Sequence, residues 1–94
     1  LIQPKIMNQI QAILTIDTDN LPDNFQEILK EEQAVVAAWK AEGFLSHLYL
    51  REAKNGAVLQ FNGLTAEQVK EKMESLPFYK ISTRIEYYSL IQQF

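Results

Sequence analysis

The chain has 94 residues, of which 47% are hydrophobic and 22% are charged, and its formal net charge is −3. This composition is typical of one small globular domain, residues 1–94, and disfavours a disordered chain. A membrane-spanning helix is also disfavoured, because no apolar run approaches the roughly 18 residues that it needs. The nine basic residues are scattered, which disfavours a nucleic-acid partner. The absence of cysteine excludes disulfides and thiolate metal ligands, and it fits a cytoplasmic protein.

Alternation of apolar and polar residues predicts the first strand. Its apolar side consists of Ile10, Ala12, Leu14 and Ile16, and Met7 is a natural first residue. For residues 1–6, a leader or added segment and a native start fit the sequence equally well.

Helical spacing begins near Phe25 and predicts the first helix over residues 22–42. Pro22 suits the first turn, and Gly43 suits the position after the last turn because glycine tolerates the left-handed conformation. The positions of this helix that are expected to face the sheet are Ile28, Leu29, Glu32, Val35, Val36 and Trp39.

The next segment predicts a β-hairpin. Its first strand is expected over residues 44–52, with one side made of Phe44, Leu48 and Leu50 and the other of Leu45, His47, Tyr49 and Arg51. Asn55-Gly56 predicts a type I′ turn, in which both central residues have positive φ. The partner strand follows over residues 57–62.

Thr65 and Gln68 fit a capping box that opens a second helix, and Pro77 ends it. The inward residues of this helix are Val69, Met73 and Leu76. A last strand is expected over residues 81–91. The order β-α-β-β-α-β predicts an α+β, ferredoxin-like domain, in which a four-stranded antiparallel sheet carries both helices on one face.

The other face of this sheet is expected to be too apolar for free exposure, because it carries Leu45, Tyr49, Val58 and Leu90. A chain of this length also buries only roughly 60–65% of its unfolded surface, so a lone monomer is marginally stable. We therefore expect a homodimer or a larger homo-oligomer in which two sheets pair face to face, as in a dimeric α+β barrel.

Glu32 is the carboxylic acid among the inward positions of the first helix. A buried carboxylate must be paired, protonated or in contact with a wet cavity. One interpretation is structural: the side chain bends out to solvent or pairs with Arg84 or Lys72. The other is a general base in a cleft between the first helix and the sheet, its proton affinity raised by apolar neighbours.

His47 is the one histidine of the chain, and residues two apart in a strand share a face, so His47, Tyr49 and Arg51 are expected to form a polar ladder. The ladder is either part of an oligomer interface or, since histidine changes charge near neutrality, a titrating site. A single histidine without clustered partners indicates no metal site.

The candidate pocket-lining residues are Tyr49, Trp39, Tyr79 and Arg84, with packing in the core or at an interface as the alternative for the aromatic ones. Arg84 and Glu86 are neighbours on one face of the last strand and are expected to make cross-strand or inter-subunit pairs. The sequence contains neither a nucleophile elbow nor a glycine-rich phosphate loop, and no cofactor is expected.

Several short motifs are spread over about residues 8–92: Lys30-Glu31-Glu32-Gln33-Ala34, Gly43, His47-Leu48-Tyr49, Arg51, Ser75-Leu76-Pro77-Phe78 and Ile85-Glu86. Together they resemble the muconolactone isomerase family. The resemblance implies the same small domain, assembly into rings of dimers, and a cofactor-free proton shift on a small unsaturated lactone during aromatic degradation. It also implies that Glu32 moves the proton, while His47 and Arg51 fall at the histidine and arginine of the family's second strand.

Three functions stay open. The first is a muconolactone-isomerase-like protein that acts on a small lactone or organic acid. The second is a dimeric-barrel monooxygenase-like enzyme that acts on a small aromatic compound. The third is a non-catalytic ligand-binding or assembly domain, in which Glu32 and Arg84 are structural. The enzyme functions require a cavity of ~300 Å³ or more that contains the Glu32 carboxyl group.

Overall fold

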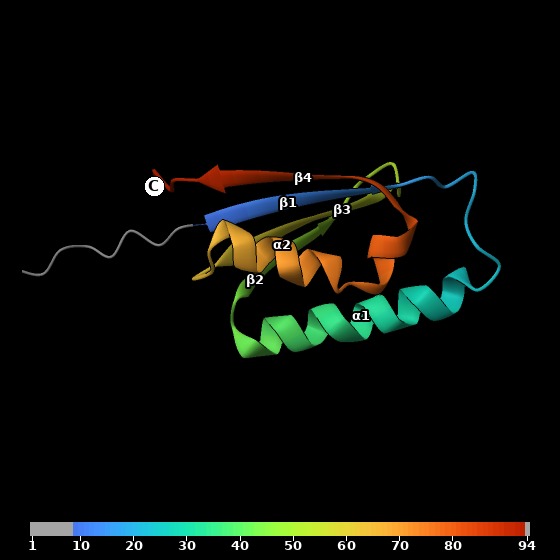
Figure 1. The fold of residues 1–94 in the computed structure, drawn as a ribbon, viewed down its shortest axis with the longest axis horizontal. Helices are drawn as coiled ribbons and strands as arrows, with labels where there is room; N and C mark the ends of the chain where they lie inside the picture. The colour runs from blue at the N-terminus through green and yellow to red at the C-terminus, as the bar shows by residue number, and fades with distance from the viewer. Residues whose placement is uncertain (1–8, 94) are drawn as a thin grey trace, which may run out of the picture.

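The computed structural model describes residues 9–93 and confirms the predicted β-α-β-β-α-β order. Its elements are β1 (Gln9–Ile16), α1 (Phe25–Glu42), β2 (Leu45–Leu50), β3 (Gly56–Asn62), α2 (Ala66–Glu74), the 3₁₀ helix η1 (Pro77–Ile81) and β4 (Ser82–Leu90). The strands form one antiparallel sheet in the order β2-β3-β1-β4, and Figure 1 shows both helices on the same side of it. This is the ferredoxin-like arrangement. Met7 and residues 1–6 lie outside the described residues.

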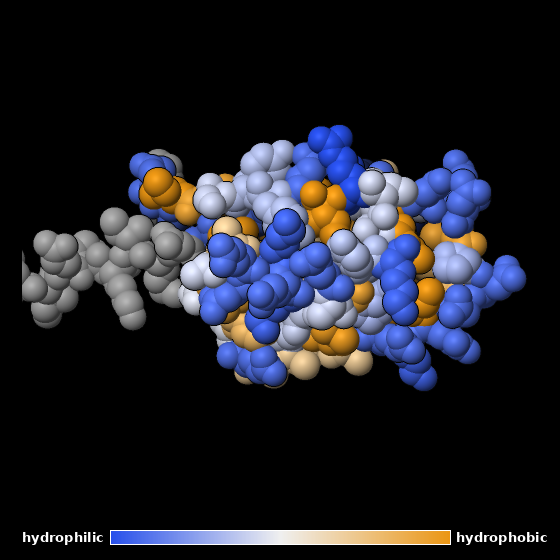
Figure 2. Space-filling view, viewed as in Figure 1, coloured by the Kyte–Doolittle hydropathy of each residue, from blue (hydrophilic) through white to orange (hydrophobic). Residues whose placement is uncertain are grey.

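The core lies between the helices and one face of the sheet. Alternation along β1 buries Ala12 and Leu14, which are 0% and 1% exposed. Across the neighbouring strands, Ala12 faces Leu59 and Tyr87. From α2, Val69 and Met73 complete this core, as the sequence predicted. Figure 2 shows mainly hydrophilic side chains over the outward side of α2, so this helix is amphipathic. None of the helices in residues 9–93 is long and apolar enough to cross a membrane.

The first helix begins later than predicted and ends where expected. Pro22 lies in a turn before the helix, where its carbonyl accepts a hydrogen bond from the Phe25 N–H at 3.0 Å. Gly43 ends the helix with φ of 94°, and its N–H donates to the carbonyls of Trp39 and Lys40. Trp39 is buried and packs against Phe61, with ring centroids 5.9 Å apart, so it belongs to the core.

A β-bulge changes the predicted sides of β2. Leu45 pairs with Phe61 whereas His47 pairs with Gln60, so two steps along β2 match one step along β3. The extra residue is Ser46, and its hydroxyl group donates a hydrogen bond to the Gln60 carbonyl at 3.0 Å. Leu45 therefore points into the core and is 4% exposed. The prediction that Leu45 shares a side with His47 and contributes to the other face was wrong.

The hairpin between β2 and β3 also differs from the predicted type I′ turn. Positive φ occurs at Lys54 (60°) and Gly56 (149°), not at the adjacent pair Asn55-Gly56. The Lys54 N–H donates to the Arg51 carbonyl at 2.8 Å, which forms a turn before Asn55. The Asn55 carbonyl accepts a hydrogen bond from the Ile16 N–H of β1 at 2.8 Å, and this contact holds Asn55 to the sheet.

The second helix has the predicted capping box, in which the Gln68 N–H donates to Thr65 Oγ1 and the Thr65 N–H donates to Gln68 Oε1. The sequence did not predict η1, which follows Leu76 and has Pro77 in its first turn. Its buried residue, Phe78, is 8% exposed, and η1 packs against α1.

We expect Gly56→Ala to lower the free energy of unfolding by roughly 2–4 kcal/mol. A Cβ atom at Gly56 would lie 1.9 Å from the Leu14 carbonyl oxygen, and the backbone φ there is +149°. Gly43→Ala is the matched control, since Gly43 also has positive φ but no atom within 4 Å of an added Cβ. The control should cost only about 1–2 kcal/mol. Urea unfolding of the three proteins measures the difference, and equal losses would contradict the steric explanation.

Candidate functional site

Glu32 lies on the inward side of α1 and is 9% exposed, which makes it the buried charged residue of the described chain. Its Oε1 atom accepts a hydrogen bond from the Phe78 N–H of η1 at 3.0 Å. Phe25 stacks on Phe78, with ring centroids 5.8 Å apart, so the surroundings are largely apolar. The inward orientation agrees with the sequence prediction, but the partner is a backbone N–H and not Arg84 or Lys72.

Those two basic residues are engaged elsewhere. The Lys72 ammonium group lies over the ring of Phe44, 4.3 Å from its centroid. Arg84 Nε lies 3.4 Å from Glu86 Oε1, on the same strand. No cation therefore neutralises Glu32 among the ion pairs of residues 9–93.

Burial raises the pKa of Glu32 from 4.5 to about 7, although the Phe78 N–H opposes this by stabilising the charged form. Because the folded protein binds this proton more tightly than the unfolded chain, the protonated carboxyl group favours folding. The stabilisation is present below about pH 4.5 and is lost as the pH rises through about 7.

We expect Glu32→Gln to be more stable than the unaltered protein at pH 8, by up to about 3 kcal/mol, and similar in stability at pH 4.5. The amide oxygen can still accept the Phe78 hydrogen bond, while the cost of a buried negative charge disappears. Urea unfolding from pH 4.5 to 8 measures the difference between the two proteins. Glu31→Gln, at the exposed neighbouring position, is the control. The same pH dependence in all three would contradict a raised pKa at Glu32.

The predicted ladder of polar residues lies on the opposite face of the sheet. His47 and Tyr49 are exposed there, and their rings stack with centroids 5.9 Å apart and an interplanar angle of 1°. Arg51 follows on the same side, where its Nη1 atom donates to Thr15 Oγ1 at 2.8 Å. The sheet therefore lies between these residues and Glu32, and one chain does not bring the three predicted catalytic side chains together.

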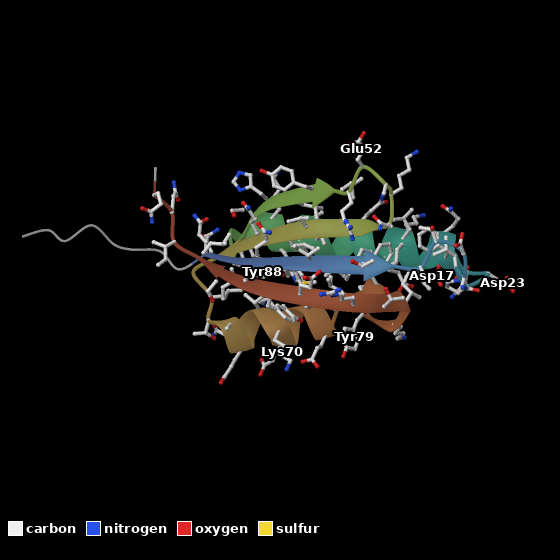
Figure 3. All side chains as sticks on the ribbon, turned by 90° about the horizontal axis from the view of Figure 1, so that it is seen from above. Asp17, Asp23, Glu52, Lys70, Tyr79 and Tyr88 are labelled. Carbon is white, nitrogen blue, oxygen red and sulfur yellow. The ribbon has the colours of Figure 1, made fainter. Side chains whose placement is uncertain are left out.

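This second face, which no helix covers, is called the open face below. Its central positions are Ile13 and Gln11 of β1, each flanked by paired residues of β3 and β4. Tyr88, labelled in Figure 3 in the view onto the sheet, donates from its hydroxyl to Glu86 Oε2 at 2.8 Å. The Glu86 carboxylate thus contacts both Tyr88 and Arg84, which disfavours the inter-strand pairing considered for Arg84.

Two of the surface cavities of residues 9–93 are relevant to the predicted site residues. A groove of about 520 Å³ between α1 and β2 is lined by Gln33, Val36, Ala37, Lys40, Leu45, Ser46, His47 and Leu48. A smaller one, of about 280 Å³, is lined by Lys70, Glu74, Tyr79, Ser82, Thr83, Arg84, Ile85 and Tyr87. The predicted pocket residues Tyr79 and Arg84 thus share a cavity, whereas Trp39 lies in the core and Tyr49 lines neither. Glu32 lines neither of these cavities, so the cavity around its carboxyl group that the enzyme functions require is not among them.

Two features of these sites were not predicted from the sequence. They are the Phe78 backbone as the partner of Glu32, and Lys40 as the charged residue of the larger groove. Lys40 lies one turn after Val36 on the helix, a spacing that could have indicated their shared side. Among residues 9–93, no group of three or more His, Cys, Asp or Glu is placed to hold a metal ion.

The fold and these sites define a small ferredoxin-like α+β domain with one uncovered sheet face. Among solved structures it is similar to the protein PA3566 from Pseudomonas aeruginosa, with a TM-score of 0.59 and 12% sequence identity. The match covers 96% of this chain and 97% of that one, and at this identity it shows the shared fold. No family model matches the chain, and no curated protein matches it.

Proposed function

We propose that the chain is a muconolactone-isomerase-like protein that shifts a proton on a small lactone or organic acid, with Glu32 as the acid and base. The observation that carries this proposal is the pKa of about 7 at a buried, inward-pointing carboxyl group. A group that removes a proton from one carbon and returns it to another must be available in both protonation states. A pKa near the working pH provides both.

In this proposal, η1 covers the carboxyl group when no substrate is bound. The Phe78 N–H holds Glu32 Oε1, so a substrate reaches the carboxylate only when η1 moves away from α1. The carboxylate then takes a proton from carbon, the bonding electrons form an enolate, and the protonated Glu32 returns the proton at the other end of the enolate. The released Phe78 N–H is a suitable donor to the enolate oxygen.

We expect Glu32→Gln to slow proton exchange on an unsaturated lactone by at least about 100-fold, because an amide cannot accept the proton. Exchange of the lactone C–H for deuterium, followed by NMR, measures the rate. The rate of the unaltered protein should rise as the pH passes through about 7, where Glu32 loses its proton. Glu31→Gln is the control with an unchanged rate, and full activity of Glu32→Gln would refute the assignment.

A specific observation favours a second candidate, a non-catalytic assembly domain. Glu32 lines neither of the two cavities described above, and its Oε1 already has a backbone partner. In this case the carboxyl group only joins η1 to α1. Glu32→Gln would then raise stability above pH 7 without changing any activity.

Either function is proposed for a homo-oligomer in which two open faces pack together. Tyr49 and Tyr88 are 52% and 47% exposed on this face, and Ile13 lies in the middle of it between Val58 and Glu86. Contiguous exposed apolar side chains of this kind mark interaction surfaces. His47 and Arg51 lie on the face through which we propose that the copies pair, and their catalytic roles remain predictions.

We expect Ile13→Lys to halve the mass of the assembly measured by sedimentation velocity. The lysine would be buried against the second sheet, whereas in a single chain it lies opposite Glu86 and is tolerated. Thr18→Lys, in the exposed turn after β1, should leave the mass unchanged. An Ile13→Lys protein with the original mass would show that the open faces do not pair.

A further inference from the structure

The free edge of β2 carries an unusual run of exposed apolar side chains. Leu48, Tyr49 and Leu50 are consecutive and are 42%, 52% and 81% exposed. They lie on an edge strand, since β2 pairs with β3 alone. Edge strands usually carry charges, prolines or bulges that prevent pairing with other chains. β2 has no charged residue or proline, and its bulge lies before Leu48.

The backbone of this run is also directed outward. The Arg51 N–H donates to the Gly56 carbonyl of β3 at 3.0 Å, so Arg51 and, by alternation, Tyr49 and His47 direct their polar backbone groups toward β3. The N–H and C=O groups of Leu48 and Leu50 therefore point away from the sheet. These four backbone groups can form hydrogen bonds with another strand.

We propose that the β2 edge pairs with the β2 edge of a second copy, antiparallel and about a two-fold axis at Tyr49. In this register Leu48 lies opposite the partner subunit's Leu50, and Leu50 lies opposite the partner subunit's Leu48. Each of these two pairs exchanges two backbone hydrogen bonds, so the outward groups of both strands are all satisfied. The two four-stranded sheets become one sheet of eight strands.

The side chains fit this register. On the helix side, each leucine meets a leucine of the other copy beside the groove between α1 and β2. On the open face, Tyr49 meets the partner subunit's Tyr49. No like charges face each other, because residues 44–50 contain no Lys, Arg, Asp or Glu. Leu50, which is 81% exposed in the single chain, thus gains an apolar neighbour.

This interface is independent of Glu32 and distinct from packing of the open faces. It uses the edge of the sheet and main-chain hydrogen bonds, whereas the open faces would meet through side chains alone. A chain with both interfaces forms an assembly larger than a dimer, because the edge contact is made by main-chain groups of β2 and leaves the centre of the open face around Ile13 uncovered.

Cysteine cross-linking tests the register directly, because the chain has no cysteine. Directly opposite residues of a non-hydrogen-bonded antiparallel pair have Cα atoms about 4.5 Å apart, within the range of a disulfide. Tyr49→Cys should therefore form a disulfide-linked dimer under mild oxidation. His47→Cys is the control. In this register the two cysteines are offset by four residues along the paired strands, so they lie about 13 Å apart. Both variants are prepared in the Ile13→Lys background, in which the open faces cannot pair.

We expect the Tyr49→Cys dimer to form at least about tenfold faster than the His47→Cys dimer. In the unaltered protein, amide hydrogen exchange should show that the N–H groups of Leu48 and Leu50 are protected, with protection that increases with protein concentration. Leu50→Lys should remove this protection, whereas Leu21→Lys, at another exposed leucine, should not. Equal cross-linking rates, or unprotected amides in the concentrated protein, would overturn the proposal. Protected amides without a Tyr49→Cys cross-link would also overturn it, since a different strand would then cover the edge.

Discussion

The helices cover only one face of the sheet, and the rest of the structure depends on this constraint. Both helices pack on the face that carries Ala12 and Leu14, and this single layer supplies the core. Side chains alternate along each strand, so every second residue lies on the opposite face, where no helix covers it. The exposed Tyr49 and Tyr88 and the half-buried Ile13 are the direct result. A second chain is the simplest cover for such a surface.

Glu32 shows how one buried polar contact can serve either stability or chemistry. The carboxyl group joins α1 to η1 through the Phe78 N–H, and the apolar surroundings make its negative charge costly. The same cost keeps the proton bound up to near-neutral pH, which is the property required of a general acid and base. Measurements of stability and of proton transfer on the same variants separate the two roles, since only the second needs a substrate to displace η1.

The fold followed from local patterns, whereas the site depended on contacts between distant segments. Period-two and helical spacings predicted all four strands and both helices, and the position of Glu32 on α1 predicted its burial. The bulge at Ser46 could not be predicted, because Leu45 and Phe44 are both apolar and either can point inward. The partner of Glu32 could not be predicted either. It is the backbone N–H of Phe78 in the first turn of η1, a short helix that the sequence did not predict.

The two edges of the sheet differ in charge, and this difference limits the addition of strands from other chains. The outer strand β4 carries Arg84 and Glu86, whose charges meet within their own strand, while β2 ends in Leu48-Tyr49-Leu50. Strand-by-strand addition into a fibril requires two edges that accept one another. With one apolar edge and one charged edge, the proposed edge pairing stops at two copies, so the charges of β4 disfavour the addition of further strands.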